Sequence, residues 1–319
     1  MNYIAICVAS YKRPLGLKRL LESFDNMVYQ DGQVEIFIAD NDDEGHAAFD
    51  YVEANRTRHR HKIHCEIESN PGISFARNRC LAMAYGAGPQ FSYFAFTDDD
   101  IAVSQNWIAD LVLTAETYGA YVVFGKREPR FECVPSNEIL HSGLFHDEFQ
   151  CPVSGMEVEE GPTSNMLVAA RVFDKIGYAP FDVKLSLSGG EDTDFCIQMR
   201  MSGFRFVAGA SAVCYEFFPK ERLSEQWITN RYFRTGSTYG YLTKKHKSRT
   251  SFYIGAAKKT LVLVKLYLMY LLSGDLPSKC RLYNTLGYFY FITKGNSFQA
   301  YRREGGSLQP ATIVQKSLY

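Results

Sequence analysis

Four short apolar runs in the first hundred residues each end on polar residues, and this pattern restricts the fold more than any other feature. Continuous apolar runs of four to eight residues are typical of parallel strands buried on both faces. Leucine and aromatic residues at helical spacing separate the runs. This alternation predicts an α/β chain with a mostly parallel, doubly wound sheet whose ligand site lies above the carboxyl ends of its strands. The runs are residues 3–9 (YIAICVA), 34–39 (VEIFIA), 63–67 and 91–97 (FSYFAFT).

Further elements are expected along the rest of the first 218 residues. The helix that opens at residue 191 ends near Gly203, a residue type that favours helix termination. The other helices are expected in residues 17–24, 47–60 and 73–85, and the other strands in residues 121–126, 164–170 and 204–217.

The charges are divided unevenly between the two ends of the chain. All 319 residues together contain 35 Lys and Arg and 35 Asp and Glu, a formal net charge of zero, which excludes binding to nucleic acid through bulk positive charge. Residues 219–319 contain 17 Lys and Arg and 4 Asp and Glu, a net charge of +13, and residues 1–218 balance it with −13. We therefore expect a domain over residues 1–218 and a basic, aromatic, helical region over residues 219–319.

The eight cysteines are scattered, and none forms a CxxC pair. The first apolar run follows Met1 almost directly and is too short for the apolar region of a signal peptide. These features predict a cytoplasmic protein with reduced thiols.

The densest chemical signal is the acidic run Thr97-Asp98-Asp99-Asp100 at the end of the fourth apolar run. In an extended chain, side chains two residues apart lie on the same face, so Asp98 and Asp100 can converge on one cation. Hard oxygen ligands suit Mg²⁺ or Mn²⁺. The alternative is a solvated acidic turn, and the position at a strand end favours the metal site.

A second acidic motif, residues 189–195 (GGEDTDF), places two glycines before three acids that open a helix. A carboxylate held there can act as a general base on a hydroxyl. Acids in a first helical turn are also favoured by the helix dipole, so capping is the alternative explanation.

Arginines provide the candidate cationic partners of a phosphate. Arg77 lies one turn inside the helix expected after residue 72, beside a strand end, where it can reach a base or diphosphate. Arg231 and Arg234 lie three residues apart, hence on one helix face, and Gly236 follows them. Surface positions remain the alternative for all three arginines.

Five motifs follow one another along the chain: ASYKRP (residues 9–14), ADND (39–42), NPGISFARN (70–78), TDDD (97–100) and GGEDTDF (189–195). In this order they resemble the motifs of the inverting glycosyltransferases of family 2, which have the GT-A fold. The resemblance extends over residues 3–240. NPGISFARN together with RYFRTG (231–236) is also similar to bacterial exopolysaccharide and lipopolysaccharide glycosyltransferases.

The resemblance implies a role for each matching residue. Asp192 is the general base and Glu191 contacts the acceptor, while Asp100 and Asp98 hold Mn²⁺ or Mg²⁺ at the diphosphate. Many GT-A enzymes have a further metal ligand, a His, after the last strand of the sheet, and Glu216 is the candidate replacement here. The residues expected to bind the nucleotide-sugar are Ser10, Tyr11, Arg13, Asp40, Asn70, Arg77, Asp98, Asp99, Arg231 and Arg234.

The implied reaction transfers a sugar from a nucleotide-diphosphate sugar to a hydroxyl of a saccharide, with inversion at the anomeric carbon. UDP is the default nucleotide, with Asp40 accepting a hydrogen bond from the uracil imide. The QxxRW motif of processive synthases is absent, which disfavours processive polymerisation. Two other classes stay open: a sugar-phosphate nucleotidyltransferase, which should have a Gly-rich loop containing Arg where ASYKRP stands, and a non-catalytic module that binds nucleotide-sugars or glycans.

The basic region contains two apolar, aromatic stretches, residues 260–272 and 283–292, with lysines and arginines around them. The first has 13 residues, fewer than the roughly 20 that span a bilayer. A basic, aromatic segment of this kind is typical of a peripheral protein on an anionic membrane, here the inner face of the cytoplasmic membrane. The membrane suits a lipid-linked saccharide acceptor. The alternatives are a helical pair packed on the catalytic domain and a homodimer interface.

Residues 131–161 are expected to shape acceptor choice.

Overall fold

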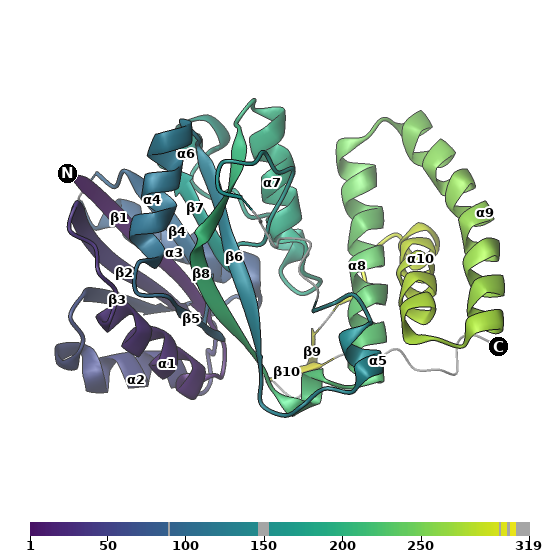
Figure 1. Ribbon diagram of the computed structural model, residues 1–319, viewed down its shortest axis with the longest axis horizontal. Coiled ribbons are helices and arrows are strands. Elements are labelled where there is room, and N and C mark those ends of the chain that lie inside the picture. The colour runs from purple at the N-terminus through teal and green to yellow at the C-terminus, as the bar shows by residue number, and fades with distance from the viewer. Residues whose placement is uncertain (89, 146–152, 300, 305–306, 311–319) are drawn as a thin grey trace. The chain divides into compact units, whose positions relative to one another are not determined.

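The computed structural model describes residues 1–88, 90–145, 153–299, 301–304 and 307–310 (Figure 1). The chain divides into two compact units. Unit 1 comprises Met1–Arg130, Asp147–Ser186 and Glu191–Phe217, and unit 2 comprises Phe131–His146, Leu187–Gly190 and Phe218–Tyr319. Unit 2 therefore includes two short segments from within the first 218 residues, which the change of composition at residue 219 does not indicate.

An eight-stranded mixed sheet with the order β3-β2-β1-β4-β7-β6-β8-β5 organises the first part of the chain. Its first four strands are parallel to one another, whereas β7 runs antiparallel to both β4 and β6. The strands are β1 (Asn2–Ser10), β2 (Gly32–Asp40), β3 (Lys62–Ile67), β4 (Tyr93–Asp98), β5 (Ile101–Val103), β6 (Val122–Phe131), β7 (Asn165–Ala169) and β8 (Phe206–Phe218).

The register of the parallel strands brings three carboxyl ends to the same edge. Ser10 at the end of β1 is paired with Asp40 at the end of β2, and Ala9 is paired with Asp98 at the end of β4. The chain order changes direction between β1 and β4, and ligands of open α/β sheets bind at such a switch point.

Helices cover both faces of the sheet, as the apolar runs predict. In β1, Ile4, Ile6 and Val8 face one hydrophobic core, whereas Ala5 and Cys7 face the other, so the strand is buried on both sides. The first core contains α1 (Pro14–Asp25), α2 (Ala47–Asn55) and α4 (Trp107–Tyr118), and the second contains α3 (Ile73–Gly86), α6 (Arg171–Ile176) and α7 (Glu191–Met201).

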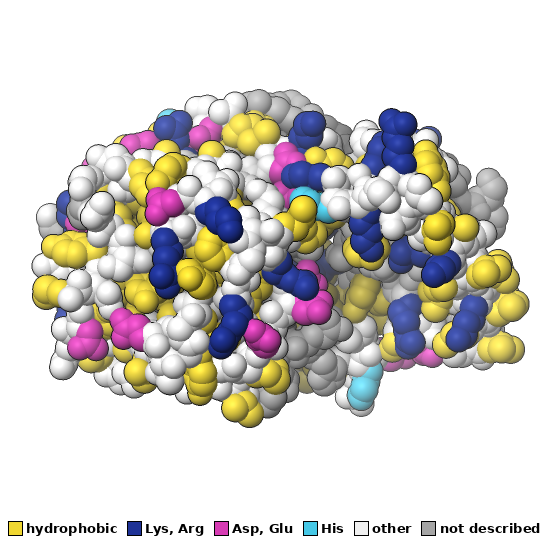
Figure 2. Space-filling view, turned by 90° about the horizontal axis from the view of Figure 1, so that it is seen from above, with side chains coloured by type: hydrophobic (Ala, Val, Ile, Leu, Met, Phe, Trp, Pro, Cys, Tyr) yellow, Lys and Arg dark blue, Asp and Glu magenta, His cyan; other side chains and the backbone are white. Residues whose placement is uncertain are grey.

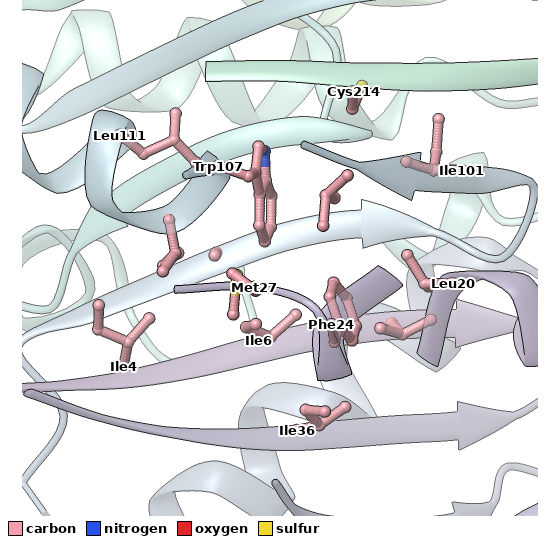
Figure 3. Close-up of a cluster of buried hydrophobic side chains, with 14 of the residues drawn as sticks. Ile4, Ile6, Leu20, Phe24, Met27, Ile36, Ile101, Trp107, Leu111 and Cys214 are labelled. Atoms are coloured by element: carbon pink, nitrogen blue, oxygen red, sulfur yellow. The ribbon is translucent and has the colours of Figure 1, made fainter. Parts of the chain in front are cut away.

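Trp107 lies in the first core, where its ring stacks on Phe24 at a centroid distance of 6.0 Å (Figure 3). Its indole N–H donates to Asn165 Oδ1 at 2.7 Å. Asn165 is fully buried, and its amide also donates to the carbonyl oxygens of Lys126 and Ala212. This polar contact therefore ties α4 to three strands of the sheet.

Unit 2 is mainly helical. Its long helices α8 (Glu225–His246) and α10 (Leu276–Lys294) cross at glycines. A Cβ at Gly236 would lie 1.7 Å from the carbonyl oxygen of Asn284, and one at Gly287 would lie 1.9 Å from that of Phe233. Within the described residues, no helix combines the length and apolar character that a membrane crossing requires. The elements of this unit are α5 (Asn137–Leu140), η3 (Lys220–Arg222), α8 (Glu225–His246), α9 (Arg249–Ser273), α10 (Leu276–Lys294), and the antiparallel pair β9 (Tyr301–Glu304) and β10 (Ser307–Pro310).

Candidate active site

The acidic turn at the end of β4 is held by the loop that follows β1. Ser10 Oγ donates to Asp99 Oδ2 at 2.9 Å, and the Tyr11 N–H donates to the same oxygen at 3.1 Å. Arg13 Nη1 lies 2.8 Å from Asp99 Oδ1. Burial raises the pKa of Asp99 to about 6, and the Arg13 guanidinium acts in the opposite direction. The middle acid of TDDD is therefore an internal anchor for this loop.

Arg13 also contacts the last acid of the turn. Its Nη1 lies 2.9 Å from Asp100 Oδ2, so one nitrogen contacts two carboxylates. Helix α1 approaches the turn closely at Gly16, where a Cβ would lie 2.4 Å from the carbonyl oxygen of Asp99. In this structure, the side chains of Ser10 and Arg13, assigned from the sequence to the nucleotide, are engaged with the acidic turn.

Arg77, in the second turn of α3, connects the two acidic motifs. Its side chain is buried, and its Nη2 donates to Asp98 Oδ1 at 2.8 Å. Its Nη1 forms an ion pair with Glu191 Oε1 at the start of α7. Burial lowers the pKa of Arg77, but the neighbouring acids Asp98, Glu191 and Asp192 together raise it by more, so the guanidinium stays charged. The sequence indicated a contact with the base or diphosphate, whereas here both terminal nitrogens bind carboxylates.

The three acids that open α7 have different surroundings. Burial raises the pKa of Glu191 to about 7 against the effect of Arg77, and its Oε2 has no hydrogen-bond partner among the described residues. Asp192 is half-buried, and its Oδ1 accepts the N–H of Thr193 at 2.7 Å. Asp194 is fully buried and accepts from Gln198. Asp192 is therefore the partly exposed acid of the three. It also lies in the first turn of α7, where the helix dipole favours a carboxylate.

Asp40, at the end of β2, is the residue predicted to accept a hydrogen bond from the uracil imide. It is fully buried, and its Oδ2 accepts the N–H groups of Ala48 and Phe49 at the start of α2, at 2.9 Å each. Its Oδ1 accepts the Asp42 N–H at 3.0 Å. Both oxygens thus accept hydrogen bonds from backbone N–H groups. A helix cap and a nucleoside ligand both place an acid directly after a strand, so the sequence does not distinguish them.

Sequence reasoning missed Asn41 and Glu68, which shape the neighbouring loop. The Asn41 amide donates to the carbonyl oxygens of Glu68 and Asn70 at 2.8 and 2.7 Å, and its Oδ1 accepts the Gly72 N–H. Glu68 Oε1 accepts both the backbone and side-chain N–H groups of Asn70, so the predicted ligand Asn70 is held by this network. Gly72 has a φ of +116° and precedes α3. The ADND motif, which contains Asn41, is the signal that could have indicated this role.

The structure does not gather the three predicted metal ligands into one cluster. Among the residues that the structure describes, no group of three or more His, Cys, Asp or Glu side chains could hold a metal ion. Glu216 Oε2 instead pairs with Arg127 Nη1 at 2.9 Å. Asp98 and Asp100 supply hard carboxylate oxygens on one turn, whereas the carboxylate of Asp99 between them is bound to the loop after β1. This donor set fits Mg²⁺ or Mn²⁺ when phosphate oxygens complete the coordination.

Arg231 and Arg234 lie on α8 in unit 2. The Arg231 guanidinium carbon lies 5.5 Å from the centroid of the Trp227 ring. A Cβ added at Gly189 would lie 3.5 Å from Arg234 Nη1. A Cβ added at Gly190 would lie 2.2 Å from Thr238 Cγ2. Gly189 and Gly190 have φ values of +75° and +88°, so both the backbone conformation and the approach to α8 require glycine at position 190.

In the segment expected to shape acceptor choice, residues 146–152 lie outside the described residues.

Comparisons with known proteins identify the family and the fold of the chain. Residues 5–164 match the family model "Glycosyl transferase family 2". The chain is 34% identical over 261 residues to "Succinoglycan biosynthesis protein ExoM" of Rhizobium meliloti (strain 1021). This alignment covers 80% of each of the two chains. It is also similar to the crystal structures of S. aureus TarS 1-349, alone and in complex with UDP. Each has a TM-score of 0.51, 15% sequence identity, and coverage of 99% of this chain and 98% of that chain. The structural likeness shows the expected GT-A fold, and the family match and the ExoM alignment show that the chain is a glycosyltransferase of family 2.

Proposed function

We propose that this glycosyltransferase moves a sugar, with inversion, from a UDP-sugar to a hydroxyl of a lipid-linked, exopolysaccharide or lipopolysaccharide saccharide. The observation that carries the proposal is the buried Arg77, which holds Asp98 of TDDD and Glu191 of GGEDTDF on one guanidinium. A donor-side acid and an acceptor-side acid are thereby kept together. The UDP-bound TarS structure supports UDP as the nucleotide, and the name of ExoM supports polysaccharide biosynthesis.

In the proposed reaction, Asp192 takes the proton of the acceptor hydroxyl. The hydroxyl oxygen attacks the anomeric carbon from the side opposite the diphosphate, and the bond from that carbon to the phosphate oxygen breaks. UDP leaves, and a single displacement inverts the anomeric configuration. Asp192 suits the base because it is half-buried. Among the described residues its side chain accepts one hydrogen bond, from the neighbouring Thr193 N–H to Oδ1, which leaves Oδ2 for a hydroxyl.

Glu191 is proposed to position the acceptor. Its Oε1 is paired with Arg77, but its Oε2 is buried without a partner among the described residues. A buried carboxylate oxygen without a hydrogen bond is costly, and a sugar hydroxyl would supply the missing donor. The same contact would orient the attacking hydroxyl toward Asp192.

Asp98 and Asp100 are proposed to hold Mn²⁺ or Mg²⁺. Glu216 on β8 is a further candidate ligand, and each of the three carboxylates is paired with an arginine in this structure. When bound, the metal supplies positive charge that stabilises the leaving diphosphate. Arg231 and Arg234 are proposed to contribute further positive charge to the same diphosphate. Ser10, Tyr11, Arg13 and Asp99 are proposed to hold the acidic turn in place for the nucleotide.

We also place the protein at the inner face of the cytoplasmic membrane, as a peripheral protein. The support is the basic, aromatic character of residues 219–319, which suits a lipid-linked acceptor.

The substitution Asp192→Asn tests the base. It keeps the size of the side chain and removes the proton acceptor, so transfer should fall about a hundredfold or more while UDP affinity is retained. Release of UDP from a panel of UDP-sugars, with Mn²⁺ and with alkyl glycosides as acceptors, measures the reaction. Asp174→Asn, on the surface helix α6, is the matched control. Near-normal turnover in folded Asp192→Asn protein would reject the base assignment, and wild-type protein inactive on every UDP-sugar would reject the donor.

Removal of a metal ligand gives a separate readout. In calorimetry with UDP, Mn²⁺ should strengthen binding to the wild-type protein, and Asp100→Ala should lose that increment because one of two carboxylate ligands is gone. Asp174→Ala should retain it. An Mn²⁺ increment that survives Asp100→Ala would remove Asp100 from the metal site.

A further inference from the structure

Helix α9 leaves most of its surface outside the packing of unit 2. Of its 25 residues, Phe252 alone is buried. Its inner side packs on α10, where the rings of Phe252 and Tyr288 lie 6.3 Å apart and Lys259 Nζ lies 5.0 Å from the centroid of the Tyr288 ring. The side of α9 that faces away from α10 is therefore open to an occupant.

The open side of α9 is apolar. Its large residues recur at spacings of three, four and seven, so they lie along one side of the helix. Each is more than half exposed, and an apolar patch of this extent on a protein surface marks an interaction site. Figure 2 shows hydrophobic and basic side chains next to one another on the surface of unit 2. We call this set the outer face: Tyr253, Ile254, Leu261, Val264, Tyr267, Leu268, Leu271 and Leu272.

The charges along α9 all have one sign. The helix contains Arg249, Lys258, Lys259 and Lys265 and no Asp or Glu. Lys258 and Lys265 are exposed and lie seven residues apart, which places both along one edge of the outer face. An occupant that matches this face must offer an apolar interior beside negative charge.

We propose that α9 lies in the surface of an anionic lipid bilayer, with its outer face among the upper acyl chains and Lys258 and Lys265 at the phosphates. Two lysines near an anionic surface each contribute attraction, and tyrosines such as Tyr253 and Tyr267 favour the boundary between water and lipid. The packing on α10 keeps the helix on the surface. The proposal deepens the peripheral membrane location proposed above, and it is independent of the transfer reaction.

A second copy of the chain is the competing occupant. Ile254, Leu261 and Leu268 are spaced like one position of a coiled-coil seam. Two copies of α9, however, would bring lysines together without any acid on either helix to pair with them. The outer face is also wider than a two-position seam, because Tyr253 and Tyr267 extend it. Charge complementarity therefore favours anionic lipid.

Flotation with vesicles tests the proposal on the full chain. Wild-type protein should float with vesicles of phosphatidylcholine and phosphatidylglycerol and remain in the dense fraction with phosphatidylcholine alone. The combined change Lys258→Gln and Lys265→Gln should lower the partition coefficient by about twenty-five-fold, since each lysine contributes about fivefold. Leu261→Gln, Val264→Gln and Leu268→Gln together should reduce it by about a hundredfold or more.

Matched controls separate these effects from general changes of surface. Leu15→Gln, Leu113→Gln and Met201→Gln change exposed apolar residues on other helices, and Lys18→Gln with Lys184→Gln removes two exposed lysines elsewhere. Both control proteins should float like the wild type. UDP affinity should be the same for all variants, so a failed flotation is distinguishable from a failure of the proposed reaction.

Three outcomes would overturn the proposal. They are a wild-type protein that does not float with anionic vesicles, equal flotation with phosphatidylcholine alone, and flotation that survives the triple glutamine change. Light scattering identifies the competitor: a dimer that the triple change converts to a monomer without any effect on flotation would assign the outer face to a second copy.

Discussion

Arg77 is the residue on which the two acidic motifs depend. Asp98 and Glu191 both contact its guanidinium, and all three side chains lie at least partly within the protein. Loss of one partner from a buried ion pair leaves an uncompensated charge, which costs more than the pair itself contributes. Arg77 is therefore proposed as a positioning residue whose removal affects both halves of the site.

Arg77→Met should reduce the free energy of unfolding by about 3 kcal/mol or more, because it leaves buried carboxylates without a cation. Arg200→Met removes an exposed arginine that pairs with Glu159 and should change it by less than about 1 kcal/mol. Urea unfolding at neutral pH measures both variants. Equal losses in the two proteins would show that the Arg77 network has no special energetic role.

The pKa of Glu191 gives a pH-dependent test. Its folded-state pKa of about 7 lies above the ordinary value of 4.5, so the folded protein binds this proton more tightly than the unfolded chain. The resulting stability is fully present below the ordinary pKa and is lost as pH rises through the folded pKa. The free energy of unfolding of the wild type, minus that of Glu191→Gln, should therefore decrease between about pH 5 and about pH 8. An increase over this interval would mean that Arg77 lowers the pKa of Glu191 instead.

At the scale of elements, the glycines of α8 and α10 have a packing role. Gly236 belongs to RYFRTG, which the sequence analysis connected with phosphate binding through the two arginines. In the structure Gly236 lies against the backbone of α10, and Gly287 lies against the backbone of α8. The glycine of this motif therefore has a packing role, whereas the two arginines are proposed ligands of the diphosphate.

Gly236→Ala should destabilise unit 2 by about 1–3 kcal/mol, because its Cβ would overlap the Asn284 carbonyl and separate the helices. Gly86→Ala is the matched control, since Gly86 closes α3 with no neighbouring atom within 4 Å of an added Cβ. The control should be neutral or stabilising by about 0.5–1 kcal/mol. Chemical unfolding followed by circular dichroism compares them, and a Gly236→Ala protein as stable as the wild type would refute the close crossing.

The elements that could be predicted from the sequence have either a continuous apolar run or apolar residues at helical spacing. β1, β2 and β4 are continuous apolar runs because both faces of these strands are buried. β5 was missed because it has only three residues, and its pairing partner β8 lies more than 100 residues further along the chain. α4 was missed although it contributes six buried residues. No element was expected between the strands at residues 91–97 and 121–126, although apolar residues recur at helical spacing in residues 107–115.

At the scale of the whole molecule, the motifs that resemble family 2 were sufficient to predict the family and the α/β fold. The partners of individual side chains were not predictable in the same way. Arg77 contacts acids 21 and 114 positions away, and Asp99 contacts a loop more than 85 positions away. Such pairings depend on which strand ends meet, and local spacing carries no information about them. The same holds for Asp40, whose burial depends on the position of α2.

The division into units has a consequence for how such a chain can arise. The polypeptide enters unit 2 after Arg130, after Ser186 and after Phe217. Tyr232 of α8 donates to the carbonyl oxygen of Ser142, and Thr238 of α8 abuts Gly190, so the two internal segments pack on the C-terminal helices. Unit 2 is therefore not a module that gene fusion at one end of a catalytic domain can add. Its transfer to another catalytic domain would require compatible insertions at two internal loops as well as the C-terminal helices.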